Sequence, residues 1–229
     1  MSRTDSQPTP RRGFLGTIAA ASLAIGMGGT LAERAHAAAR DIPQPWPGSP
    51  DVERWPEVKG KHRQVYDAVS WNHGMSLIWS MIFLNTNNQA SKAADSDLTA
   101  VVVLRHEAIP LAFTDPIWEK YKLGEAFKID DPKTKSPSMR NFFYHSGEGD
   151  MMLPGASIET LQARGVQFGV CSVALAVYSG MRADAIGVDK NVAKQEWTAA
   201  VVPGITLLPS GVWGVNRAQE HGCTYCYAS

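Results

Sequence analysis

Short apolar runs alternate with longer segments of helical length from residue 64 to residue 229. Gln64–Ser70 is typical of a strand, and Leu98–Leu104 is a near-continuous β-branched run, as expected of a strand covered on both faces. Met75–Leu84 is apolar on nearly all sides, so this predicted helix must be buried between layers or between subunits. The polar residues of Asn85–Asp97 indicate a loop between this helix and the second strand.

The same alternation continues through the second half of the chain. Val166–Val170 is typical of a buried strand, and Ser172–Tyr178 is an apolar helix that we expect Gly180 to close, because glycine readily adopts the left-handed conformation found at helix ends. The other predicted elements are helices at Asp115–Tyr121, Ser157–Ala163 (Ser157 as N-cap, Gly165 as stop), Lys190–Trp197 and Gly211–Glu220 (Ser210 as N-cap, Gly222 as stop), a strand at Ala199–Val202, a strand or loop at Ile205–Leu208, and an edge strand at the C-terminus.

About five short strands alternating with helices predict a single α/β domain at residues 63–229, with one flavodoxin-like parallel sheet and helices on both faces. Lys128–Gly155 interrupts this pattern with prolines, glycines and aspartates. Irregular segments of this length in a compact domain are usually functional covers or flexible insertions. We therefore expect an irregular insertion at about residues 128–155 that covers the site.

The first 37 residues resemble a twin-arginine export signal. Arg11 and Arg12 precede a mildly apolar run that ends near Met27, and Ala35-His36-Ala37 is an A-x-A cleavage pattern. The run is short and diluted by glycines, so a permanent transmembrane helix is the weaker interpretation. We expect cleavage near Ala37 and a mature protein in the bacterial periplasm.

Residues 38–62 contain five prolines interleaved with Trp46 and Trp55. Prolines at this density oppose both helix and sheet, which predicts an extended arm. Two tryptophans favour an arm that is pinned to a surface, either of its own domain or of a neighbouring subunit. A disordered leader is the alternative.

Charge and length narrow the class of partner. Removal of the 37-residue leader leaves 192 of the 229 residues, the size of one domain. The leader takes four arginines and two acidic residues with it, so the mature part has 18 Lys and Arg against 20 Asp and Glu. This balance, without a basic run, argues against nucleic acid and against an anionic membrane surface. The expected partners are small molecules or other proteins.

Cys171 is the strongest candidate for a functional residue, because it lies at the predicted strand-to-helix turn after Val170. A thiol there faces the positive end of the helix dipole, which favours the thiolate, and parallel sheets bind ligands at the carboxyl ends of their strands. His73 and His106 follow the first two strands, so they are expected at the same edge, where an imidazole can tune the thiol or shuttle its proton. The alternatives are a cysteine that only fills the core and two hydrogen-bonded loop histidines.

Cys223 and Cys226 have the CxxC spacing. In an oxidising compartment a structural disulfide is the expected state, and a redox-active or metal-binding pair is the alternative. Tyr227 stands where covalent haem attachment needs a histidine, and one CxxC supplies only two zinc ligands. No cofactor is therefore predicted, and a metal or haem site that uses the cysteines with His73 and His106 is a third alternative.

From about Gln64 onward the chain resembles the DsrE/DsrF-like sulfur-relay proteins, which share the YchN-like fold. The likeness rests on the strand and apolar helix of Gln64–Leu84, the strand and turn of Val101–His106 with Ile109–Ala112, the LQARGVQFGVCSVAL run around Cys171, and the late run from Val201 to Tyr225. The resemblance implies a flavodoxin-like unit that assembles as a trimer or hexamer, with Cys171 carrying sulfur as a persulfide. The export signal, the insertion and the C-terminal cysteine pair depart from that family.

Two functions from different classes follow. The first is an exported thiol protein, a sulfur carrier, sulfurtransferase or thiol redox protein, in which Cys171 reacts with small sulfur compounds or partner thiol proteins. In this hypothesis His106 and His73 tune the thiol, and Cys223 with Cys226 is a structural clip or a resolving pair. The second is a non-enzymatic periplasmic binding or assembly protein of the same fold, in which Cys171 is inert. The sequence is compatible with an enzyme and with a non-enzymatic protein.

Overall fold

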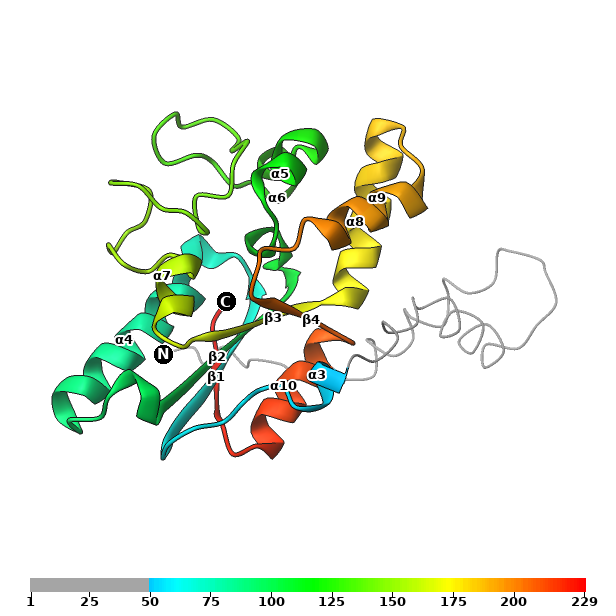
Figure 1. The fold of residues 1–229 in the computed structure, drawn as a ribbon. Helices are drawn as coiled ribbons and strands as arrows, with labels where there is room; N and C mark the ends of the chain where they lie inside the picture. The colour runs from blue at the N-terminus through cyan, green and yellow to red at the C-terminus, as the bar shows by residue number, and fades with distance from the viewer. Residues whose placement is uncertain (1–49) are drawn as a thin grey trace, which may run out of the picture. The chain divides into compact units, whose positions relative to one another are not determined.

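The computed structural model describes residues 50–229 (Figure 1). The predicted signal at 1–37 and residues 38–49 of the predicted arm lie outside the described residues. Within the described part, the expectation that prolines exclude helix is wrong for a short helix, α3 (Pro50–Glu53). Pro50 is its first residue, and proline is tolerated in the first turn because its missing N–H would have no partner there anyway.

Five parallel strands form the sheet, in the order β4-β3-β2-β1-β5. The α/β fold with a single parallel sheet, expected from the sequence, is therefore confirmed. The chain adds strands in one direction from β1 to β4 and then crosses to the far side of β1 to place β5 at the edge. The strands are β1 (His62–Ser70), β2 (Leu98–Glu107), β3 (Gln167–Cys171), β4 (Ile205–Leu208) and β5 (Thr224–Tyr227).

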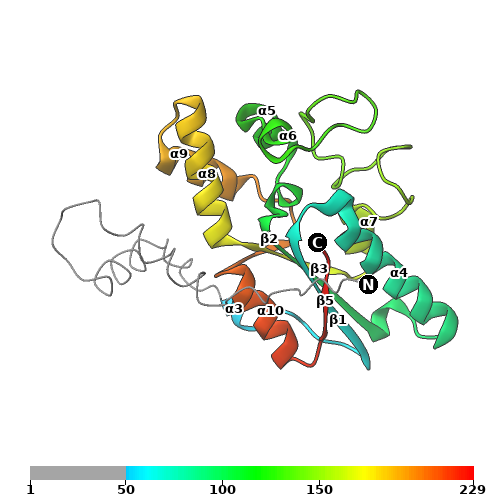
Figure 2. The same cartoon turned by 180° about the vertical axis from the view of Figure 1, so that it is seen from behind.

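Helices cover both faces of the sheet, as expected (Figures 1 and 2). The larger apolar core lies on one face and includes side chains of α4 (Met75–Ala90), α5 (Asp115–Tyr121), α6 (Leu123–Phe127), α7 (Ile158–Ala163), α8 (Ser172–Ile186) and α9 (Lys190–Ala199). The smaller core lies on the other face under α10 (Gly211–Glu220). The short helices η1 (Asn72–Gly74), η2 (Asp95–Asp97) and η3 (Ile109–Ala112) complete the described elements.

Trp55 anchors the described end of the arm to its own domain. Its side chain is 6% exposed and belongs to the smaller core, with Val101, Val103 and Leu208. The backbone just beyond it also bonds to the sheet, since Lys59 N–H donates to Thr99 Oγ1 over 2.7 Å. Trp55 therefore contacts the arm's own domain, which is one of the two surfaces expected for the arm.

Two helices run further than expected. α4 continues to Ala90, through residues assigned to a loop, and Asn87 donates its side-chain amide to the Phe83 carbonyl over 2.9 Å. α8 continues past Gly180 to Ile186 and ends at Gly187, whose φ of 73° is left-handed. The expectation that Gly180 closes this helix is therefore wrong, because packing of the helix outweighs the roughly 1 kcal/mol that an interior glycine costs.

The predicted strand at Ala199–Val202 is also wrong, whereas two predicted caps are confirmed. α9 extends through Ala199, and Val201 makes only an isolated antiparallel bridge with Phe113. Ser157 Oγ accepts the Thr160 N–H at the start of α7, and Ser210 Oγ accepts the Trp213 N–H at the start of α10. Gly165 and Gly222 adopt left-handed φ values of 88° and 84° just beyond α7 and α10.

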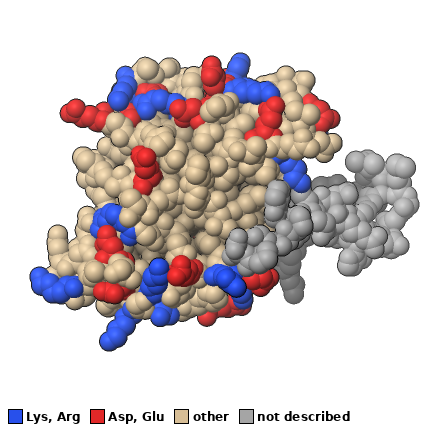
Figure 3. Space-filling view, viewed as in Figure 1, with Lys and Arg blue, Asp and Glu red and all other residues tan. Residues whose placement is uncertain are grey.

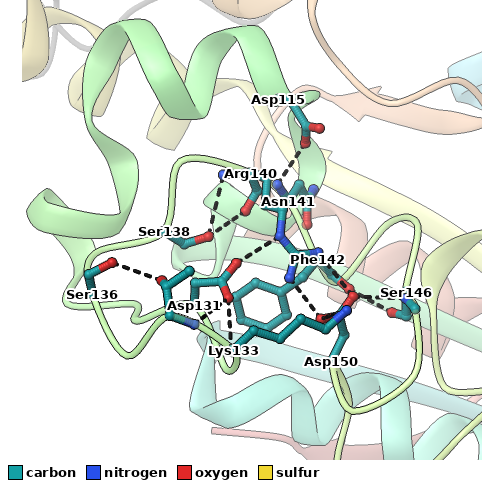
Figure 4. A network of polar contacts seen from close by, with 12 residues as sticks. Asp115, Asp131, Lys133, Ser136, Ser138, Arg140, Asn141, Phe142, Ser146 and Asp150 are labelled. Carbon is teal, nitrogen blue, oxygen red and sulfur yellow. Dashed lines mark hydrogen bonds and ion pairs between the residues drawn. The ribbon is translucent and has the colours of Figure 1, made fainter.

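The irregular insertion is held together by a polar network centred on Arg140 (Figure 4). Arg140 Nε donates to Asp131 Oδ2 over 2.7 Å, and its two Nη atoms donate to the Asp150 carboxylate over 2.9 and 2.7 Å. The hydrogen bonds from Arg140 hold the pKa of Asp150 well below its usual range. Burial opposes the charge of Asp131, but hydrogen bonds from the Lys133 backbone and from Arg140 outweigh burial and lower its pKa. Between residues 128 and 157 these contacts replace regular structure.

Candidate functional site

The strand order places a crevice between β3 and β4. α8 follows β3 and contributes to the larger core, whereas α10 follows β4 and contributes to the smaller core on the opposite face. Two neighbouring strands that lead into helices on opposite faces form the switch point at which open α/β sheets bind ligands. A cleft of about 400 Å³ opens at this point, with Arg105, His106, Cys171 and Ser210 among its polar residues and Val173, Val177, Tyr178, Met181 and Val212 along its walls.

Cys171 ends β3 and is the N-cap residue of α8, which confirms its predicted position at a strand-to-helix turn. Its Sγ accepts the backbone N–H of Ala174 over 3.3 Å. The residue is 6% exposed and lines the cleft. The thiol is therefore a buried group that lines the cleft, where it receives the partial positive charge of a helix N-terminus.

Arg105 is a second polar residue of the cleft, and the sequence interpretation did not identify it. Its Nε and Nη2 donate to the two carboxylate oxygens of Asp67 over 2.6 and 2.9 Å. Tyr225 donates its O–H to the same carboxylate over 2.9 Å. The hydrogen bond to Asp67 raises the pKa of Arg105, although burial opposes that shift.

The sequence contains part of the signal for this pair, and the register of β1 against β2 supplies the rest. Asp67 is the one charged residue inside the apolar part of β1, and it pairs in register with Val103. Arg105 lies two positions beyond Val103 and so faces the same side of the sheet, because side chains alternate along a strand. A carboxylate and a guanidinium on one face of adjacent parallel strands indicate an ion pair.

Gly211, at the start of α10, is required by the close approach of Arg105. A Cβ at this position would lie 2.5 Å from the Arg105 Cβ and 2.7 Å from its Cδ. We expect Gly211→Ala to lower the free energy of unfolding by about 1–3 kcal/mol through overpacking. Gly180→Ala is the matched control, because its Cβ would meet only Lys190 Cδ at 3.9 Å and alanine is the better helix former. Urea unfolding of both variants checks this, and equal effects would contradict it.

The two candidate histidines do not share one site. His106 is exposed, lines the cleft with Cys171, and contacts Tyr178 edge-on with ring centroids 5.9 Å apart. His73 lines a separate hollow of about 370 Å³ beside the insertion, where its ring meets Trp71 edge-on at 4.5 Å. The structure therefore brings His106 to the Cys171 cleft and places His73 elsewhere.

Cys223 and Cys226 are free thiols, so the predicted disulfide is wrong for this structure. Cys223 belongs to the smaller core and Cys226 packs against the larger one, on opposite faces of the sheet. Residues three apart on an extended strand point to opposite faces, which explains why the two thiols do not meet.

Within residues 50–229, no three His, Cys, Asp or Glu side chains gather as a metal-ligand set, and no helix has the length and hydropathy of a membrane span.

Comparison with known proteins adds little to this picture. No family model matches the chain, and no curated protein matches it. Among solved structures the chain is similar to MTH1491, a protein of unknown function from Methanobacterium thermoautotrophicum, at 17% identity and a TM-score of 0.39. That similarity covers 73% of this chain and 99% of the other.

On the face shown in Figure 3, acidic and basic side chains are interspersed, and neither sign forms a broad patch.

Proposed function

We propose that this chain is an exported, DsrE-like thiol protein that carries sulfur or exchanges disulfides through Cys171. The observation that carries the proposal is the position of the Cys171 thiol, which lines an open cleft at the switch point of the sheet. A backbone N–H points at the sulfur, and Arg105 and His106 line the same cleft. A reactive cysteine needs this kind of partly accessible, electropositive surrounding.

The chemistry is a transfer of sulfane sulfur. The Cys171 thiolate attacks the outer sulfur of a persulfide R–S–SH, a new S–S bond forms at Cys171, and the donor S–S bond breaks. The donor leaves as the thiolate RS⁻ with the electron pair of that bond, so neither an oxidant nor a reductant is consumed. His106 is placed to exchange a proton with the incoming or leaving sulfur, because its ring is exposed in the same cleft.

The remaining parts of the proposal rest on the sequence. The twin-arginine pattern around Arg11 and Arg12 supports export to the periplasm. The family resemblance supports a trimer or hexamer. Small sulfur compounds and partner thiol proteins are the proposed reactants.

Alkylation of the folded mature protein, followed by mass measurement of its peptides, tests this function. We expect Cys171 to be labelled before the other cysteines at neutral pH, or to carry the added mass of one sulfur atom. Burial raises the pKa of both Cys223 and Cys226, so a smaller fraction of each is thiolate at that pH. Labelling of Cys171 only after unfolding would overturn the proposal.

One observation favours the non-enzymatic alternative. Cys171 is 6% exposed, and its sulfur already accepts the Ala174 N–H as an N-cap, which is a structural role. In that case the protein is a binding or assembly module of the same fold, and Cys171 stabilises α8 without reacting. The order of labelling described above separates the two functions.

A further inference from the structure

Arg105 presents free hydrogen-bond donors to the Cys171 cleft. Its Nε and Nη2 are held by Asp67, whereas Nη1 has no hydrogen-bond partner among residues 50–229. The Arg105 side chain is 27% exposed and lines the cleft, while the Asp67 side chain behind it is 4% exposed. The buried Asp67 carboxylate holds the guanidinium, and the aliphatic stem of Arg105 passes close to Gly211, so the outer edge of the guanidinium is preorganised to meet a ligand.

The surroundings of Arg105 favour an anion. Among the described residues, none of those that line the cleft carries a carboxylate. Glu107 lines the adjoining hollow, which shares Tyr178 and Met181 with the cleft. The N-termini of α8, with 15 residues, and α10, with 10 residues, both open onto the cleft and add partial positive charge.

The walls of the cleft favour an apolar body. Val177, Met181 and Val212 are 46%, 59% and 66% exposed, and all three line the cleft. Exposed aliphatic side chains grouped beside a guanidinium suit a ligand that joins a hydrocarbon or aromatic group to an anionic head. A bare inorganic anion would leave this apolar surface in water.

We propose that the cleft takes an organic sulfur anion with an apolar body, and that Arg105, positioned by Asp67 and Tyr225, is the residue that selects its charge. This inference rests on the proposed reactivity of Cys171. An organic thiosulfonate, R–SO₂–S⁻, represents the class. The Cys171 thiolate attacks the outer sulfur and forms a new S–S bond, the S–S bond of the donor breaks, and the sulfinate R–SO₂⁻ leaves with the electron pair beside Arg105. Charge and electrons balance without a further reactant.

Methanethiosulfonate reagents that transfer a sulfonatoethyl or a trimethylammonioethyl group measure the charge preference. The rate at which each modifies Cys171 in the folded mature protein is divided by its rate with 2-mercaptoethanol. We expect the anionic reagent to be favoured roughly twofold to fivefold, less than an unpaired cation would produce, because the Asp67 carboxylate partly neutralises Arg105. Added salt should reduce this preference. Because the wild type alone gives this ratio, the test does not depend on any variant folding.

Variants then assign the preference to a residue. Arg105→Gln should bring the ratio of the two normalised rates, anionic over cationic, close to one. Arg105→Lys should restore most of the preference for the anionic reagent, because the positive charge returns. Arg164→Gln is the matched control, since Arg164 makes a similar pair with Asp95 at the amino ends of β2 and β3, in a different hollow. A control variant that lowered the ratio as much as Arg105→Gln would contradict the role of Arg105.

Benzenethiosulfonate and inorganic thiosulfate test the apolar body. We expect benzenethiosulfonate to form the Cys171 persulfide faster, and Val212→Asp to remove that advantage. Modification of Cys171 without preference for charge or apolar body would overturn this inference and leave the proposed function standing. Failure of every reagent to reach Cys171 in the folded protein would overturn both.

Discussion

Cys171→Ser is expected to abolish the sulfur adduct and the fast alkylation while the fold is kept. Serine is a strong N-cap residue, so its hydroxyl oxygen can accept the Ala174 N–H that Cys171 Sγ accepts in the wild type. Peptide mass measurement after reaction with a persulfide donor, together with the urea unfolding midpoint, checks both parts. The loss of reactivity should be complete, because the reacting atom itself is removed.

Two further variants separate the reactivity of the Cys171 thiol from its role as the N-cap of α8. Cys171→Ala removes the sulfur and the cap together, and we expect it to cost about 0.5–2 kcal/mol of unfolding free energy that the serine variant retains. Cys226→Ser is the control, since that thiol lies on β5, away from the cleft, and should leave the reaction unchanged. A sulfur adduct that persists in Cys171→Ser would show that the reaction uses another cysteine.

Arg140→Met is expected to lower the free energy of unfolding by up to about 3–5 kcal/mol at neutral pH, because it removes the guanidinium that pairs with two buried carboxylates. The side chains of Asp150 and Asp131 are 1% and 8% exposed, and Arg140 pairs with both. Lys133→Met is the matched control. Lys133 also approaches Asp150, at 3.2 Å, but its side chain is 52% exposed, so its loss should cost no more than about 1 kcal/mol.

Acid should narrow the difference between the Arg140 variant and the wild type. The fold lowers the pKa of Asp131 and of Asp150, so their stabilising contribution is present above the ordinary carboxyl pKa and is lost as the pH falls below it. Urea unfolding of both proteins at neutral pH and at about pH 3, roughly one unit below the ordinary aspartate value, measures this change. A difference that stays constant over this range would contradict the role assigned to the network.

Elements with a strong local pattern were predictable from the sequence. The buried run Leu98–Leu104 lies in β2, the caps at Ser157 and Ser210 form as expected, and Asp115–Tyr121 is a helix with the predicted bounds. Helix ends were less predictable, because a glycine permits a helix to stop without requiring it. Gly180 lies inside α8, since tertiary packing decides how far this helix continues.

The site was predictable only in part, for geometric reasons. The strand-to-helix turn located Cys171, and strand order brought His106 beside it. His73 also follows a strand, but a left-handed turn with φ of 51° and the insertion place it in another hollow. The Asp67–Arg105 pair becomes visible only when the register of β1 against β2 is known.

The placement of β5 affects how a newly made chain behaves on the ribosome. Gln64 in β1 pairs with Thr224 in β5, so one side of this inner strand gains its partner only from the strand that is synthesised after the other four. Until that strand has been synthesised, β1 is an open edge whose N–H and C=O groups can pair with a neighbouring nascent chain. We therefore expect this topology to need protection of β1 during translation, for example by a chaperone. After release, rapid pairing of β5 with β1 closes the sheet.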